Sequence, residues 1–160
     1  MTIFTLTKRV GMNISTGSRA DIEAIAGFQV AMARESEGTV LDPEVVRSGV
    51  AAAMEDSAKG SYIVAKEGAE AIGSLMLTRE WSDWNNRWYW WIQSVYVVPE
   101  WRGRGVFRAM YAAVQQMAAE SGVAQVRLYV DKGNTTAQHA YQRVGMEECH
   151  YLMYEATVEP

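Results

Sequence analysis

The sequence is poor in residues that cross-link a chain or ligate metals. It contains one cysteine, Cys149, and two histidines, His139 and His150. A single cysteine excludes an intrachain disulfide and a cysteine-based zinc site. Two histidines are too few for a histidine cage around a metal ion. We therefore predict neither a disulfide nor a bound metal.

Proline, net charge and long apolar runs are also scarce. Three prolines in 160 residues, 49% of them hydrophobic, argue against a disordered chain. The 15 basic and 19 acidic residues give a net charge of −4, which favours neither nucleic acid nor an anionic membrane surface as a partner. No apolar run approaches the roughly 20 residues of a membrane span, and the N-terminus lacks the apolar segment of a signal peptide. We expect a cytoplasmic protein with one domain over residues 1–160.

The pattern of apolar residues predicts a domain that mixes strands and helices. Residues 1–11 are either a first strand or an N-terminal extension, because Met12 is an equally good start for the domain. Strands are predicted at 12–16, 61–66, 71–78, 88–98, 125–130 and 147–155. Helices are predicted from 18–21 to 35–38, from 42–43 to 59–60, from 106 to 122, and over 135–144. The fold class is therefore α/β (α+β), a mixed sheet with helices on both sides.

A turn rich in glycine and arginine stands between the predicted strand at 88–98 and the helix that follows. Gly103 and Gly105 have no Cβ atom that would keep an anion from the backbone N–H groups at the helix N-terminus. Arg102, Arg104 and Arg108 add positive charge. The pattern indicates a phosphate-binding turn, and a tight connection with solvated arginines is the alternative. The turn is not a P-loop, because no Gly-Lys-Ser/Thr ends it, and it lacks the third glycine of a dinucleotide-binding fingerprint.

Aromatic residues concentrate just before this turn, since all six tryptophans lie between Trp81 and Trp101. Trp81 and Trp84 fall in a predicted polar loop at 80–87. Glu80 and Asp83 lie beside them. Rings next to carboxylates suit a cationic or amine-bearing ligand. Packing in the core or between strands is the alternative for the tryptophans at 90 and 91.

Two motifs together resemble the GNAT superfamily of acetyl-CoA-dependent N-acetyltransferases. The family pattern Gln/Arg-x-x-Gly-x-Gly/Ala matches Arg102 to Phe107, with Phe107 in place of the final small residue. Asn134 and Tyr141 follow, seven residues apart, before Gly145. The resemblance covers residues 71–155. It implies a mostly antiparallel sheet of six to seven strands, about four helices, and a splayed parallel strand pair that holds the cofactor.

The resemblance also implies how acetyl-CoA binds and reacts. The pyrophosphate of coenzyme A would bind the N–H groups of residues 103–108, and the thioester arm would lie along the backbone of Val95 to Val97. Tyr141 would protonate the departing thiolate as a general acid, with a buried structural tyrosine as the alternative. Asn134 would bond to the cofactor arm, cap the following helix, or do both. The implied cofactor-binding residues are Val95, Tyr96, Val97, Arg102, Gly103, Arg104, Gly105, Val106, Phe107, Arg108, Asn134 and Ala137.

The implied reaction is direct attack of a neutral primary amine on the acetyl thioester. An amine is protonated at pH 7, so a base or a water molecule must take its proton. The sequence offers carboxylates rather than a histidine for this step, and for each carboxylate taken singly a solvated surface position is the favoured alternative. The candidate substrate-site residues are Glu35, Glu37, Glu80, Trp81, Asp83, Trp84, Gln93 and Tyr129.

Other functions fit the same residues. One is a module that binds acyl-CoA and regulates a partner without turnover, and another is acetylation of proteins or peptides. A longer acyl donor is a third, because Phe107 and Trp91 would reshape an acyl pocket. The tryptophans and carboxylates at 80–84 favour a small cationic amine as the acceptor. Exposed aromatic residues on a strand edge would suit a homodimer.

Overall fold

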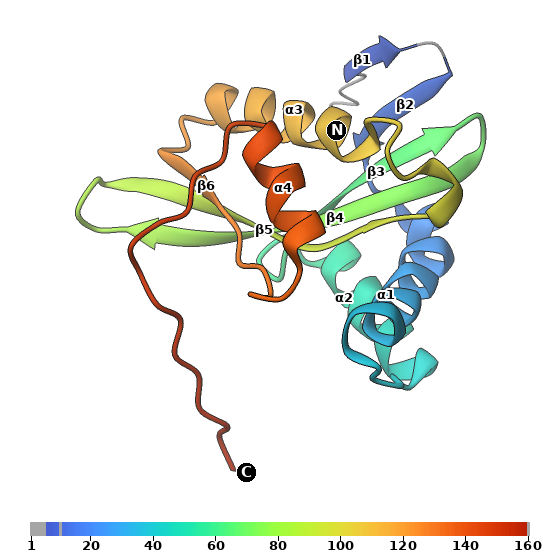
Figure 1. Cartoon of the computed structure of the whole chain (residues 1–160), viewed down its shortest axis with the longest axis horizontal. Helices are drawn as coiled ribbons and strands as arrows, with labels where there is room; N and C mark the ends of the chain where they lie inside the picture. Colours follow the sequence, from blue (N-terminus) through green and yellow to red (C-terminus); the bar gives the residue numbers. More distant parts are fainter. Residues whose placement is uncertain (1–5, 10, 160) are drawn as a thin grey trace. The chain divides into compact units, whose positions relative to one another are not determined.

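The computed structural model describes residues 11–159 and the backbone of residues 6–9 (Figure 1). The elements are β1 (Leu6–Arg9), β2 (Met12–Thr16), the 3-10 turn η1 (Arg19–Asp21), α1 (Ile22–Glu37), α2 (Pro43–Glu55), β3 (Ser61–Glu67), β4 (Glu70–Ser82), β5 (Arg87–Val97), the 3-10 turn η2 (Pro99–Trp101), α3 (Val106–Glu120), β6 (Gln125–Arg127) and α4 (Thr135–Arg143). Of the first eleven residues, 6–9 form a strand, whereas 1–5 and 10 lie outside the described residues. None of the described helices is long and apolar enough to cross a membrane.

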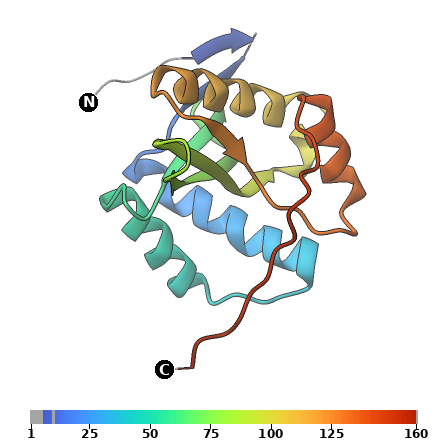
Figure 2. The same cartoon turned by 90° about the vertical axis from the view of Figure 1, so that its left-hand side faces the viewer.

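The chain divides into two compact units, Met1–Tyr129 and Val130–Pro160. The described part of the first unit contains a six-stranded sheet in the order β1-β2-β3-β4-β5-β6. The first four neighbouring pairs are antiparallel, and β5 and β6 are parallel. Helix α3 covers one face of the sheet, and α1 and α2 cover the other (Figures 1 and 2). The mixed, mostly antiparallel sheet with helices on both faces agrees with the prediction.

Each face of the sheet has its own hydrophobic core. Along β3, Ile63 points to the core beneath α3, and the next residue, Val64, points to the core beneath α1 and α2. This alternation follows from the two-residue period of a strand. Met110 of α3 is fully buried in the first core, and Ile25 of α1 is fully buried in the second. The sheet is therefore anchored on both faces.

The helix ends follow the local sequence, with one exception. The side chain of Asp42 accepts a hydrogen bond from the Glu44 N–H at 2.9 Å, so α2 begins where its N-cap and Pro43 predict. The same helix ends at Glu55, earlier than the predicted end at 59–60. Asp56 is extended and its carboxylate accepts the Ala58 N–H at 2.9 Å, a local turn that competes with the helix.

The hairpin of β4 and β5 is longer than predicted. The predicted loop at 80–87 is wrong over its first part, because β4 continues to Ser82. Trp81 lies opposite Trp88, and their rings meet edge to face at 5.0 Å. Such cross-strand pairs stabilise the part of a hairpin that extends past the helices packed on the sheet. Glu80 and Trp81 are therefore strand residues, and of the four candidate substrate residues in this segment only Asp83 and Trp84 are in the turn at 83–86.

β6 ends at Arg127, so the prediction that this strand continues over residues 128–130 is wrong.

The second unit contains α4 and a tail without regular secondary structure. Residues 147–155 form neither helix nor strand, so the predicted final strand is wrong. Alternating apolar residues make a strand only where a neighbouring strand completes the hydrogen-bonded ladder. Tyr151, Leu152 and Tyr154 in this tail are exposed instead.

Candidate functional site

β5 carries a bulge near its C-terminal end. Ser74 of β4 pairs with Tyr96, whereas Met76 pairs with Gln93. Two residues of β5, at 94 and 95, therefore stand opposite one residue of β4. Ser94 has a φ of +52°, in the left-handed region that a residue with a side chain seldom adopts. A bulge of this kind leaves part of the strand's backbone outside the regular ladder.

The parallel neighbour of β5 stops just before this bulge. The ladder between β5 and β6 has three residue pairs and ends at Trp91 and Arg127, while β5 continues to Val97. We call residues 92–97 the open stretch of β5, because β6 no longer pairs with them. Backbone N–H and C=O groups on such an edge can bind an extended ligand as an added strand. Val95, Tyr96 and Val97, which are predicted to bind the cofactor arm, lie in this stretch.

The glycine-rich turn follows the open stretch directly and starts α3. Gly103 and Gly105 have φ values of +74° and +82°, and Gly105 is the N-cap of α3. A Cβ atom at Gly103 would meet no atom within 4 Å, so glycine is required there by the backbone conformation rather than by space. The first turn of α3 carries no acidic residue. The N-terminal N–H groups and the positive end of the helix dipole are therefore suited to an anion.

The arginines of the turn are held in different ways. The Arg102 guanidinium donates to Glu35 Oε2 at 2.6 Å and to the Val97 carbonyl at 2.9 Å. The Arg104 guanidinium lies 5.2 Å from the Trp101 ring centre. Arg108, in the first turn of α3, is exposed. Arg102 thus fixes the end of β5 to the start of the turn, while Arg104 and Arg108 remain exposed at the surface.

Glu35, near the end of α1, is engaged on both carboxylate oxygens. Its Oε1 accepts the Tyr96 hydroxyl at 2.8 Å, and its Oε2 binds Arg102. The hydrogen bonds from Arg102 and from Tyr96 lower the pKa of Glu35 below its ordinary value of 4.5. The Tyr96 ring also stacks on Phe28 of α1 at 5.3 Å. Glu35 is therefore a weak proton acceptor that holds α1 against the open stretch.

A second group of polar and aromatic residues lies on β4, β5 and β6 and just after the end of β6. Trp91 Nε1 donates to Glu80 Oε2 at 2.6 Å, and Arg127 Nη1 lies 3.5 Å from Glu80 Oε1. The Arg127 guanidinium lies 4.0 Å from the Tyr89 ring centre, and Tyr129 lies 6.4 Å from Trp91. We call these five residues the Glu80–Arg127 cluster. Trp91 and Arg127 are also the last pair of the parallel ladder, so the cluster lies where the open stretch begins.

The other predicted substrate residues are dispersed. Gln93 continues the row of Tyr89 and Trp91 toward the bulge, and its amide donates to Thr78 Oγ1 at 2.6 Å. Trp81 is on the opposite face of β4 from Glu80, because successive strand residues alternate. Trp84 is 88% exposed at the hairpin turn. The exposed residues Glu37 and Asp83 lie at the end of α1 and in that turn.

Sequence reasoning missed Arg127 and Tyr89, although both belong to the cluster. Glu80, which contacts Arg127, is 47 residues away from it along the chain. An arginine between apolar residues inside the strand predicted at 125–130 was the only local sign of such a role.

The second unit carries Asn134, Ala137 and Tyr141 on and before α4. Asn134 Oδ1 accepts the Ala137 N–H at 3.1 Å, so the helix-capping alternative holds for this residue. Burial raises the pKa of Tyr141 above its ordinary value of 10. The phenol therefore keeps its proton at neutral pH, as a proton donor requires.

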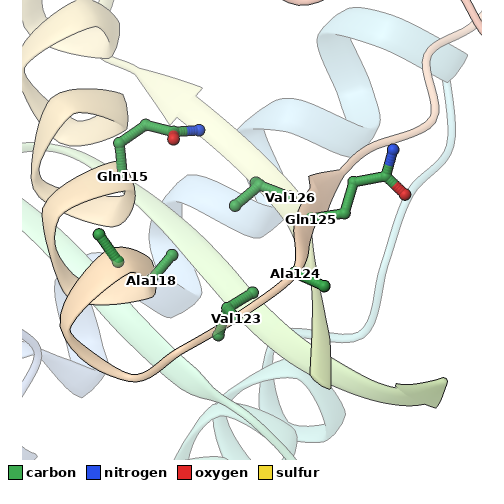
Figure 3. A pocket seen from close by; sticks show the side chains of 7 residues that line it. Gln115, Ala118, Val123, Ala124, Gln125 and Val126 are labelled. Carbon is green, nitrogen blue, oxygen red and sulfur yellow. The ribbon is translucent and has the colours of Figure 1, made fainter. Parts of the chain in front are cut away.

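A shallow pocket of about 150 Å³ lies elsewhere, between the end of α3 and the start of β6 (Figure 3). It is lined mainly by alanine and valine side chains, together with Gln115 and Gln125. It lies at the opposite end of α3 from the glycine-rich turn. Among the described residues, no three His, Cys, Asp or Glu side chains gather as a metal site would need.

Together, these features are those that an extended, phosphate-bearing ligand would need at the end of a bulged strand. The model of the acetyltransferase (GNAT) family matches residues 30–146. The chain therefore belongs to this family, as the two sequence motifs predicted.

Individual relatives agree with this assignment. The chain is 37% identical to a possible acetyltransferase from Clostridium difficile 630, with a TM-score of 0.87 over 93% of this chain and 99% of that one. It is 38% identical to the mycothiol acetyltransferase of Kocuria rhizophila over 66 residues, which are 41% of this chain and 22% of the relative. The match thus spans about a fifth of that relative's length. AAC(6')-Iy in complex with the bisubstrate analog CoA-S-monomethyl-acetylneamine shares the fold, with a TM-score of 0.75 and 18% identity over 92% of this chain and 98% of that one.

Proposed function

We propose that the protein transfers the acetyl group of acetyl-CoA to the primary amine of a small molecule. The observation that carries the proposal is that the open stretch of β5 is followed directly by the glycine-rich turn at the N-terminus of α3. A ligand with an extended arm at one end and a pyrophosphate at the other suits both. AAC(6')-Iy, which shares the fold, has been seen in complex with the bisubstrate analog CoA-S-monomethyl-acetylneamine, which supports a small amine as acceptor.

In this proposal, residues 103–108 bind the pyrophosphate through backbone N–H groups and the dipole of α3. Arg104 and Arg108 add charge at the same place. The backbone of Val95 to Val97 holds the arm and places an N–H group against the thioester carbonyl, where it would stabilise developing negative charge. Acetyl-CoA supplies the activated acetyl group. Asn134 and Ala137 keep the cofactor contacts implied by the family motif.

The proton balance follows from the side chains available. A carbon–nitrogen bond forms as the carbon–sulfur bond breaks, the amine loses a proton, and the thiolate gains one. We assign the second transfer to Tyr141, whose raised pKa keeps its phenol protonated. Glu35 does not suit the first transfer, because Arg102 and Tyr96 lower its pKa. We therefore assign removal of the amine proton to water.

Binding of acetyl-CoA to a variant of the turn tests the proposal. Gly105→Glu would place a carboxylate at the N-cap of α3, where it competes with the pyrophosphate. Gly122→Glu is the matched control, because Gly122 follows the other end of the same helix with a φ of +65°, and a Cβ atom there would meet no atom within 4 Å. By isothermal titration calorimetry we expect the dissociation constant to rise about 100-fold in Gly105→Glu and about twofold or less in the control. Equal affinities of the two variants would overturn the proposal, provided that circular dichroism shows both to be folded.

A further inference from the structure

The Glu80–Arg127 cluster has a charge pattern that differs from the one the sequence suggested. Tryptophans beside carboxylates favoured a small cationic amine as the acceptor, but Trp81 and Trp84 are outside the cluster. Its one carboxylate, Glu80, is accompanied by the guanidinium of Arg127. The cluster therefore offers one negative and one positive group side by side, between aromatic rings.

The two charged groups are only weakly engaged with each other. Their 3.5 Å contact is the longest ion pair among the described residues, at the outer limit of a hydrogen bond. The Glu80 carboxylate is fixed on its other oxygen by the Trp91 indole at 2.6 Å. The side chains of Glu80 and Arg127 remain 43% and 28% exposed. Each group can therefore accept a further partner from solution without leaving its place.

Arg127 is held in position while part of its hydrogen-bonding capacity is unused. Its Nε donates to Gln125 Oε1 at 2.9 Å, and its guanidinium lies over the Tyr89 ring. Among the described residues, its Nη2 atom has no hydrogen-bond partner. A planar guanidinium fixed on an aromatic ring with a free edge is suited to bind a carboxylate.

The cluster also lies where an acceptor must approach. Trp91 and Arg127 form the last pair of the parallel ladder, immediately before the open stretch that we assign to the thioester arm. Gln93 continues the same face of β5 toward the bulge. Met76 and Thr78 of β4 lie on that face too, and Met76 packs against the core beneath α1 and α2. A molecule bound between Glu80 and Arg127 would therefore lie beside the acetyl group.

We propose that Arg127 binds a carboxylate of the acceptor, while Glu80 accepts an N–H group of the same molecule. The acceptor class is then an amino acid or an amino-acid derivative with a free carboxylate, rather than a polyamine. A polyamine would gain from Glu80 but would be repelled by Arg127. This inference rests on the proposed function, since it concerns the acceptor of the same reaction.

Matched acceptors test the role of Arg127. Acetyl transfer is measured for a panel of free α-amino acids and the carboxamide of each, which keeps the shape and removes the negative charge. We expect wild type to prefer the acid over its carboxamide by about tenfold in kcat/KM. Arg127→Gln should abolish the preference by weakening the acid alone, and Arg127→Lys should restore part of it.

Arg79→Gln is the control variant. Arg79 is an exposed arginine of the same hairpin, next to Glu80 and therefore on the opposite face of β4. It should keep the preference of wild type. A structural role of Arg127 would lower both members of each pair equally, and that result overturns the inference. A wild-type preference for carboxamides or polyamines overturns it as well.

Equilibrium binding of the same acid and carboxamide pairs, by saturation-transfer NMR with coenzyme A present, gives a readout that needs no turnover. If wild type binds coenzyme A but shows no preference for the acids, the inference fails while the cofactor site stands. If wild type binds no coenzyme A, the proposed function fails. The acid preference measured without coenzyme A then decides the role of Arg127 separately.

Discussion

Replacement of Glu35 by glutamine tests whether the end of α1 supports the cofactor-binding turn. The change keeps the shape of the side chain but removes the charge that Arg102 and the Tyr96 hydroxyl bind. Arg102 also donates to the Val97 carbonyl, the last residue of the open stretch. Loss of the ion pair should therefore loosen the connection between β5 and the glycine-rich turn without disturbing the core.

The expected size of the effect follows from the solvent exposure of the Arg102–Glu35 ion pair. The side chains of Arg102 and Glu35 are 48% and 42% exposed, so solvent screens their attraction. Exposed ion pairs contribute about 0.2–1 kcal/mol, and the added tyrosine hydrogen bond places this one near the upper value. If the ion pair stabilises the binding conformation of the turn by about 1 kcal/mol, its loss raises the dissociation constant of acetyl-CoA about fivefold. The melting temperature should fall by about 2–4 °C.

The effect of Glu35→Gln on the melting temperature should depend on pH. The folded pKa of Glu35 is lowered by Arg102 and Tyr96, so the ionised group stabilises the fold above its ordinary pKa of 4.5. This stability is lost as the pH falls through the lowered folded pKa. The difference in melting temperature between wild type and Glu35→Gln should therefore be constant near neutral pH and shrink below pH 4.5.

Thermal denaturation across this pH range and calorimetry with acetyl-CoA measure both effects. Glu37→Gln is the control, because Glu37 is an exposed carboxylate at the end of the same helix. Glu37→Gln should change neither the melting temperature nor the affinity for acetyl-CoA. If Glu35→Gln matches Glu37→Gln in affinity for acetyl-CoA, the ion pair does not support the turn and the reasoning is refuted.

Two further predictions concern stability and the proton donor. Asp21→Asn should cost about 3 kcal/mol in urea unfolding, because Asp21 is 4% exposed and its Oδ1 lies 2.5 Å from Lys66 Nζ, which would lose its partner. Burial alone would raise the pKa of Asp21, but the hydrogen bonds from Lys66 and Ser18 outweigh burial and lower it. The stability that ionised Asp21 contributes should therefore be lost under acid conditions, as the pH falls below 3.8. Tyr141→Phe should lower kcat by about 100-fold with little change in the affinity for acetyl-CoA. Equal kcat values for wild type and Tyr141→Phe would exclude Tyr141 as the acid.

Features encoded by neighbouring residues could be predicted from the sequence. The N-cap at Asp42 and the left-handed Gly38 at the end of α1 are local, because a cap or a turn needs only a few adjacent residues. The glycine-rich turn before α3 is local for the same reason. The family motif then connected this turn to acetyl-CoA.

Features that depend on distant partners could not be predicted. The length of β4 is set by its pairing with β5, and the tail at 147–155 is not a strand because alternation cannot supply a partner. Glu35 and Arg102 are 67 residues apart in the chain, so their ion pair left no local pattern. The bulge at Ser94 likewise arises from the register of two strands rather than from a characteristic residue.

The most direct test of the central claim is release of free coenzyme A from acetyl-CoA across a panel of small amines, amino acids and N-terminal peptides. Mass spectrometry of the products should accompany it, because Cys149 is exposed and would react with thiol reagents. We predict release that depends on a small amine, with one acetyl group added to that amine. Tight binding of acetyl-CoA without turnover on any acceptor would contradict the claim and indicate a regulatory acyl-CoA-binding module. Acetylation of peptides alone would contradict the assignment of a small-molecule acceptor.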